Sequence, residues 1–324
     1  MVEEVLKNIY RCEIPLPKNP LKSVNSYLIR GQERDLIVDT GMNRDECMMA
    51  MQLCLEELRV DLSKTEFFIT HFHVDHLGLL ARLITERSVV YFNEPDAERF
   101  RSKTRWDDII HFTLLHGFPE DELRTILNYH PAYQYGLKTD VAFTILRDGD
   151  TLPAGDYVWK CIETPGHSKG HMCLYEPNEK ILLSGDHILK DITPTIQLRS
   201  EGENPLKDYL SSLEKIFRLD VRIVLPGHRS VFDSCQERIR ELEQHHEERS
   251  QEVLSILEQG CQNAFQVASK MSWDISYASW DLFPVMQKWF ATGETIAHLK
   301  YLEERGRVRR EPRGQKTAFC LSEK

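Results

Sequence analysis

Long apolar stretches are missing from the sequence. No stretch approaches the roughly 20 apolar residues that a membrane span requires. The N-terminal segment, MVEEVLKNIYRCEIPLPK, carries early acidic residues and no apolar core of signal-peptide length. We therefore expect a cytoplasmic protein without a membrane partner.

Paired cysteine motifs are also missing. The eight cysteines are scattered along the chain, with no C-x-x-C spacing and no cysteine-rich region. Because free cysteine often packs as a small apolar side chain, we expect these to be buried or idle thiols. Low-complexity tracts and repeats are absent as well, so a fibre or a disordered tail is not expected.

Basic residues are outnumbered, with 41 Lys and Arg against 51 Asp and Glu, which gives a formal net charge of -10 at pH 7. This balance disfavours a general polyanion-binding surface, because binding along a nucleic acid depends on neutralising phosphates. One local basic cluster remains near the end of the chain, at Arg305, Arg307, Arg309, Arg310, Arg313 and Lys316. Nucleic-acid binding through this cluster is an alternative that the net charge does not favour.

The order of predicted elements indicates a layered α/β domain followed by a smaller one. Apolar runs from Val24 to Thr40 predict a hairpin, and TEFFIT, a motif loop, a helix and SVVYFNE follow. After a mainly helical insertion at about 95–137, short strands and helices alternate to RIVLP. We place the domain boundary at residue 243, so that residues 1–243 form the larger domain and 244–324 the smaller.

The smaller domain is predicted to contain three short helices and a terminal pair of strands, an arrangement that resembles a winged-helix module. The helices are NAFQVASKM, FPVMQKWF and ETIAHLKYLEERG, and the strands flank Pro-Arg-Gly near residue 313. We expect this module to serve as a packing or homodimer element. His245 and His246 lie in the charged helix that leads into it and are expected to be solvated.

The segment THFHVDHLG, residues 70–78, concentrates metal-ligand side chains. His71, His73, Asp75 and His76 place four such groups within six residues, directly after an apolar strand. Imidazole and carboxylate are ligands of zinc-type divalent ions, and a loop at a strand end can direct alternate side chains to two ions. His71 and His73 can then face one ion, and Asp75 and His76 the other.

This segment resembles the H-x-H-x-D-H signature of the metallo-β-lactamase superfamily, and the likeness extends over about residues 8–235. The resemblance implies a four-layer αββα fold and assigns further residues. Asp39 in IVDTG corresponds to an aspartate that orients the motif loop by hydrogen bonds. His167 in TPGHSKGH corresponds to the third ligand of the first metal, Asp186 in LSGDH to a carboxylate bridging both, and His228 in LPGHR to the last ligand of the second.

The strand-like runs WKCIE, ILLSGD and RIVLP precede these later residues, so strand ends could deliver all of them to one edge of a sheet. His171 lies beside one of the ligand motifs, where it either supports a ligand, contacts substrate or simply packs. His111, His116, His130 and Tyr133 in the helical insertion either line a substrate lid or, as we favour, form local core.

The implied chemistry is hydrolysis, because two ions about 3.5–4 Å apart would turn a bridging water into hydroxide at neutral pH. Asp75 and His76 are the candidate catalytic residues. We favour two Zn²⁺ ions, with iron or manganese as alternatives, and a small-molecule ester or thioester as the substrate. The likeness within the superfamily is to glyoxalase II-like enzymes and to hydrolases that carry a winged-helix-like tail.

Three other functions stay open at this stage. Some winged-helix-tailed members resemble endoribonucleases, which makes an RNA phosphodiester an alternative substrate. Mononuclear-iron persulfide dioxygenases share the H-x-H-x-D-H motif. A non-catalytic, metal-binding regulatory protein is the least favoured alternative, because a complete ligand set argues for retained chemistry.

Overall fold

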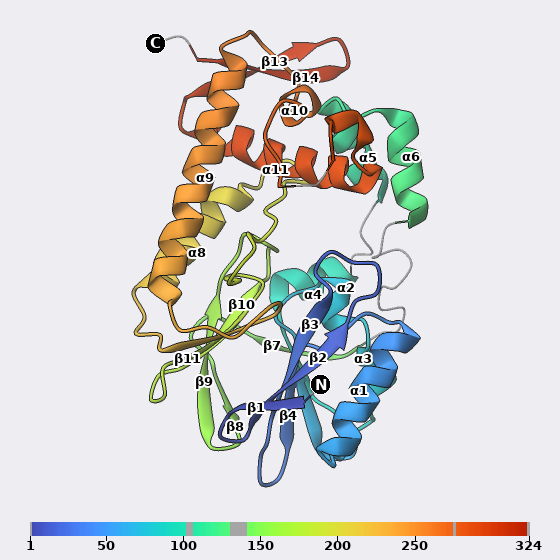
Figure 1. Ribbon diagram of the computed structural model, residues 1–324, viewed down its shortest axis with the longest axis vertical. Coiled ribbons are helices and arrows are strands. Elements are labelled where there is room, and N and C mark those ends of the chain that lie inside the picture. Colours follow the sequence, from blue (N-terminus) through green and yellow to red (C-terminus); the bar gives the residue numbers. More distant parts are fainter. Residues whose placement is uncertain (1, 102–105, 130–140, 275–276, 323–324) are drawn as a thin grey trace. The chain divides into compact units, whose positions relative to one another are not determined.

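The computed structural model describes residues 2–101, 106–129, 141–274 and 277–322 (Figure 1). The chain divides into two compact units. The first unit comprises Met1–Lys103, Pro131–Pro194 and Ser212–Ile239, and the second comprises Thr104–His130, Thr195–Ser211 and Arg240–Lys324. The second unit thus gathers residues from three parts of the sequence, and a boundary between folding domains at residue 243 stays a prediction.

The first unit contains a mixed seven-stranded sheet in which the strands follow chain order. Strands β1 to β4 pair antiparallel, whereas β4 to β7 pair parallel. The strands are β1 (Val2–Leu6), β2 (Ile9–Pro15), β3 (Ser23–Ile29), β4 (Asp35–Val38), β5 (Thr65–Phe68), β6 (Val90–Asn93) and β7 (Phe143–Leu146). The switch to parallel pairing requires crossover connections, so the segments after β4, β5 and β6 carry helices.

A five-stranded sheet, in the order β12-β11-β10-β9-β8, forms the other half of the first unit. Its strands are β8 (Thr151–Ala154), β9 (Tyr157–Glu163), β10 (Met172–Glu176), β11 (Ile181–Gly185) and β12 (Ile223–Pro226). The pairs are antiparallel except for β11 with β12, which is parallel. Every residue of β10 and β11 is buried, so both faces of the sheet are covered at these two strands, whereas β8 and β9 expose residues on one face.

The two sheets pack face to face over an apolar core. Tyr27 and Phe68 from the first sheet share this core with Trp159 and Leu174 from the second. The helix α1 (Asp45–Glu57), drawn in blue, covers the outer face of the first sheet with four buried sulfur-containing side chains (Figure 1). These layers, with the helical segments beyond the second sheet, form the mixed α/β sandwich expected from the sequence.

The remaining helical elements of the first unit are short and lie between the strands. They are η1 (Leu62–Lys64), α2 (Val74–Leu77), α3 (Leu80–Leu83) and α4 (Glu94–Arg101). Two longer helices, α8 (Pro205–Phe217) and α9 (Cys235–Leu257), contribute residues to both units. Among the described residues, no helix has both the length and the apolar character needed to span a membrane.

The second unit is mainly helical and has its own apolar core, built around Phe118, Ile126 and Trp289. Its other elements are α5 (Trp106–Leu115), α6 (Glu120–Tyr129), α10 (Ala264–Ala268), η2 (Trp280–Leu282), α11 (Val285–Glu304), β13 (Val308–Arg313) and β14 (Lys316–Leu321). The expected terminal pair of strands is present as the antiparallel hairpin β13–β14. A winged-helix arrangement stays a prediction.

One predicted helix break does not occur. FPVMQKWF and ETIAHLKYLEERG were expected to be separate helices, but Val285–Glu304 is one continuous helix. Gly293 lies in its middle, and a Cβ there would approach the Cβ of Gln197 to 3.4 Å. The glycine thus lies within the helix, in ordinary packing distance of residue 197, and does not end it.

Two further expectations are corrected in the second unit. Cys261 and Cys320 form a disulfide, whereas the other six cysteines are free and buried. The pairing could not be predicted from the sequence, because 59 residues separate the two cysteines. His246 is not solvated: it is buried, and its Nδ1 lies 3.4 Å from Nε2 of His298 on α11.

The histidines of the helical insertion do not share one environment. His116 is buried, and its Nδ1–H donates to the carbonyl oxygen of Phe112 at 2.8 Å, as expected for local core. His111 is exposed on α5. His130 and Tyr133 lie outside the described residues.

Candidate metal centre

Five strand ends and one short helix carry the candidate ligands and the supporting residue Asp39. Asp39 follows β4, His71 and His73 follow β5, and His167 lies in the loop between β9 and β10. The carboxyl ends of neighbouring parallel strands meet at one sheet edge, so side chains just beyond them converge. The remaining candidates are Asp75 and His76 on α2, Asp186 after β11 and His228 after β12.

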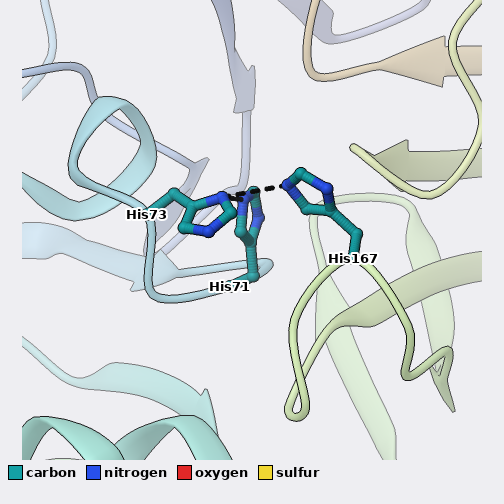
Figure 2. Close-up of side chains that lie close together, drawn as sticks. All are labelled: His71, His73 and His167. Atoms are coloured by element: carbon teal, nitrogen blue, oxygen red, sulfur yellow. Dashed lines mark hydrogen bonds between the residues drawn. The ribbon is translucent and has the colours of Figure 1, made fainter. Parts of the chain in front are cut away.

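Three histidines form the first group of candidate ligands (Figure 2). Nδ1 of His73 lies 2.9 Å from Nε2 of His71 and 2.9 Å from Nε2 of His167. The three rings point toward one another although His167 comes from a loop of the other sheet (Figure 2). Convergence of three ring nitrogens is the geometry that a single zinc-type ion requires of imidazole ligands.

Asp75, His76 and His228 form the second group. Nε2 of His228 lies 3.6 Å from Oδ2 of Asp75. All three side chains are buried, and His76 and His228 are fully inaccessible to solvent. The structure therefore brings the paired imidazoles and carboxylate of the predicted second position together.

Asp186 lies between the two groups. Its Oδ2 is 3.5 Å from Nε2 of His76 and 3.4 Å from Nε2 of His228, both in the second group. The same oxygen is 3.6 Å from Nε2 of His167 in the first group. A single carboxylate oxygen thus faces ring nitrogens from both groups, as a bridging ligand would.

Hydrogen bonds at Nδ1 hold the rings of His71 and His228 on the side that faces away from the other ligands. Nδ1 of His228 lies 2.6 Å from the carbonyl oxygen of Ser23, and Nδ1 of His71 lies 3.0 Å from Oγ1 of Thr70. Such bonds fix the ring orientation and the tautomer, which leaves Nε2 available on the inner side. The arrangement matches the outer hydrogen bonds that metal-binding histidines make in proteins.

Asp39 anchors the motif loop. Its Oδ2 accepts hydrogen bonds from Nδ1 of His76 at 2.7 Å and from Oγ1 of Thr70 at 2.8 Å. Its Oδ1 accepts the Thr70 backbone N–H at 2.9 Å. The backbone at Asp39 has a φ of 58°, a left-handed conformation that is unusual for a residue other than glycine and is often retained at functional sites.

Two glycines make room for the convergence. A Cβ at Gly227 would lie 2.5 Å from Oδ1 of Asp186, and one at Gly185 would lie 2.6 Å from Nε2 of His171. His171 itself supports Asp186, because its Nε2 accepts the Asp186 backbone N–H at 3.1 Å. His171 therefore contacts a candidate ligand instead of joining either ligand group.

The buried polar atoms of the site fit divalent cations. Within the described part of the chain, Nε2 of His76, Nε2 of His228 and Oδ1 of Asp186 are buried without a hydrogen-bond partner. Leaving buried polar atoms unsatisfied is costly, so a cluster of such atoms fits the binding of a cation. The donor set of imidazoles and carboxylates is the one that zinc-type ions take.

The electrostatics of the site couple its buried carboxylates to its histidines. Burial opposes the charged form of His76, but Asp39 and Asp186 outweigh it and hold the His76 pKa well above its usual value. Burial likewise opposes ionisation of Asp186, but His228 and His76 hold its pKa well below the usual value. Asp39 and Asp186 thus stabilise positive charge on the His76 ring, from its outer and inner sides respectively.

One buried carboxylate of the site was not predicted from the sequence. Asp96 on α4 accepts the backbone N–H of Phe72 at 3.0 Å, within the motif loop. In the sequence it occurs in NEPDAER, where an acidic residue in the first turn of a helix has an ordinary local explanation. Its position just after a strand, β6, was the only signal available.

Comparison with known proteins identifies the family. A family model described as the metallo-beta-lactamase superfamily matches residues 19–228. The chain belongs to this superfamily. A second model, the metallo-beta-lactamase-like C-terminal domain, matches residues 251–318. The chain therefore has the superfamily's fold and a C-terminal region of a type found with it.

Several superfamily members are similar over most of their length. The chain is 30% identical over 290 residues to the probable metallo-hydrolase YqjP of Bacillus subtilis, covering 86% of each protein. It is 30% identical over 222 residues to the human acyl-coenzyme A thioesterase MBLAC2, covering 64% of this chain and 74% of the thioesterase. The crystal structure of a metallo-beta-lactamase family protein from Thermus thermophilus matches with a TM-score of 0.82 and 29% identity, covering 98% of this chain and 99% of that one. These relationships make the protein a metal-dependent hydrolase.

Proposed function

We propose that this superfamily member hydrolyses thioesters of small acyl groups, using two divalent ions of which zinc is the favoured kind. His71, His73 and His167 would hold the first ion, and Asp75, His76 and His228 the second, with Asp186 shared by both. The observation that carries this proposal is the position of Asp186, whose Oδ2 lies 3.4 to 3.6 Å from ring nitrogens of both groups.

The choice of a thioester rests on the relatives. The human protein of 30% identity is an acyl-coenzyme A thioesterase, and YqjP is described as a metallo-hydrolase. A thioester presents a carbonyl carbon to water and releases a thiol, which leaves more readily than an alcohol. We infer the same substrate class for this chain, together with a cytoplasmic location.

When bound, divalent ions supply Lewis acidity that lowers the pKa of water and polarises the substrate carbonyl. The chain's own residues position and move protons. We assign Asp75 to accept the proton that water gives up as its oxygen adds to the acyl carbon. The carbon–sulfur bond then breaks, and Asp75 returns the proton to the departing sulfur. Asp39 holds Nδ1 of His76, and this contact keeps helix α2, which carries Asp75, in place during the proton transfer.

The phosphodiester alternative is less well supported, because acidic partners neutralise part of the basic cluster. Arg310 pairs with Glu303 at 2.8 Å and with Glu201 at 2.9 Å. Arg309 pairs with Glu311. A cation already paired with a carboxylate offers little to a phosphate, so we assign the C-terminal hairpin a packing or homodimer role.

Thiol release from acyl-coenzyme A substrates of increasing chain length tests the proposed function. Protein loaded with zinc or manganese is expected to release free thiol, and chelation should abolish release until metal is restored. A single-stranded RNA and a simple carboxyl ester serve as comparison substrates. Cleavage of RNA without cleavage of any thioester by the fully loaded protein would overturn the proposal.

A further inference from the structure

Asp96 is buried between the two loops that deliver the first histidine group. It is completely inaccessible to solvent, and it lies in the first turn of α4 after β6. Its carboxylate accepts three hydrogen bonds, from the Phe72 backbone N–H at 3.0 Å, the Ser168 hydroxyl at 2.7 Å and the Gly170 backbone N–H at 2.8 Å. All three partners are donors, as an ionised carboxylate requires.

Two of the three partners of Asp96 adjoin a candidate ligand, and the third, Gly170, lies in the loop that follows His167. Phe72 lies between His71 and His73 in the motif loop, and Ser168 directly follows His167. The motif loop comes from the first sheet and the His167 loop from the second, so no strand pairing holds them to each other. The Asp96 carboxylate thus links the two loops, in addition to the backbone hydrogen bond from the Met172 N–H to the Thr70 carbonyl oxygen at 2.9 Å.

Further contacts indicate that this link is closely fitted. The Arg99 guanidinium, one turn along α4, lies 4.2 Å from the centroid of the Phe72 ring, within cation–π distance. A Cβ at Gly170 would lie 2.6 Å from the Asp96 backbone nitrogen and 2.8 Å from its Cβ. The loop therefore approaches Asp96 as closely as only glycine permits.

We propose that Asp96 is a positioning residue that sets the affinity of the first metal position by holding His71 and His73 against His167. The inference rests on the metal assignment of the proposed function. Asp39 serves the second group in the same way through His76. Asp39 also binds Thr70, whose Oγ1 contacts Nδ1 of His71, so its support reaches both groups, whereas Asp96 contacts only the two loops of the first group.

The chain offers matched variants to test this role of Asp96. Asp96→Asn keeps the size of the side chain but replaces one acceptor oxygen with a donor amide, which must face a donor of Ser168, Gly170 or Phe72. Ser168→Ala removes one of the three bonds and leaves Asp96 in place. Glu98→Gln changes an exposed carboxylate on the same helix and serves as the control.

The measurement is metal affinity by chelator competition, together with the absorption spectrum of cobalt-substituted protein. His167→Ala and His228→Ala provide reference spectra for loss of the first and the second ion. Asp96→Asn is expected to lower the affinity for one ion by about 10–100-fold. The spectrum of this variant should resemble that of His167→Ala. Ser168→Ala should weaken the same ion less, and Glu98→Gln should match the wild type.

Two results would overturn the role of Asp96: wild-type affinity at both positions, or equal weakening of both ions. If Asp96→Asn does not fold, Ser168→Ala decides between the same outcomes. Failure of the proposed function would look different, because the wild-type protein would then bind no pair of ions or would bind them without releasing thiol from any thioester.

Discussion

Asp186→Asn is expected to release both ions and to lower kcat/KM for a thioester by about 10³-fold or more. Asp186 Oδ2 faces His76 and His228 on one side and His167 on the other. An asparagine keeps the volume but removes the negative charge that both ions would share. Loss of several kcal/mol of Lewis-acid stabilisation corresponds to a rate loss of this size.

His228→Ala is the matched comparison, because His228 belongs to the second group alone. It should mainly empty one metal position and leave the other filled. Metal content per chain, measured after equilibration at fixed free zinc, distinguishes the two variants. If both variants lost one ion to the same extent, Asp186 would not be the bridging ligand.

Asp39→Asn is expected to lower the free energy of unfolding by about 3–5 kcal/mol, because it breaks a buried charged contact without replacing it. Asp39 accepts three hydrogen bonds, one of them from Nδ1 of His76 at 2.7 Å. An amide cannot accept all three. Affinity for the second ion should also fall about 10–100-fold, since His76 loses the bond that orients its ring.

Urea unfolding and chelator competition measure these two effects of Asp39→Asn. Asp45→Asn is the control: its side chain is 87% exposed and pairs with Arg82 at the surface. Exposed pairs contribute about 1 kcal/mol or less, so the control should unfold nearly like the wild type. A value for Asp39→Asn close to that of Asp45→Asn would show that Asp39 does not support the site.

The sequence allowed us to predict that the candidate metal ligands lie close together, because so many histidine and aspartate residues rarely occur next to one another. Three imidazoles and a carboxylate within residues 71–76 have no common structural explanation, and His167, Asp186 and His228 each follow a strand-like run. The structure brings them together from two sheets instead of the single sheet edge expected: residues 71–76 follow β5 of the first sheet, and the other three follow strands of the second. The layered α/β fold follows from the same alternation of strands and helices.

Contacts made through common residue types could not be predicted in this way. Asp96 has the appearance of an ordinary acidic residue at a helix start, and Cys261 lies 59 residues from its disulfide partner. His246 was expected to be solvated because its neighbours in sequence are charged, yet its side chain is buried beside His298. In each case the residue that makes the contact is distant in sequence. The local sequence pattern therefore does not indicate the contact.

Elemental analysis of the purified native protein tests the central claim most directly. Zinc, manganese and iron per chain are quantified together on protein that has not been exposed to a chelator. The two groups of ligands around Asp186 predict close to two zinc or manganese ions per chain. About one iron per chain, with neither of the others, would contradict the two-ion hydrolytic site and would favour oxygen-dependent thiol chemistry instead.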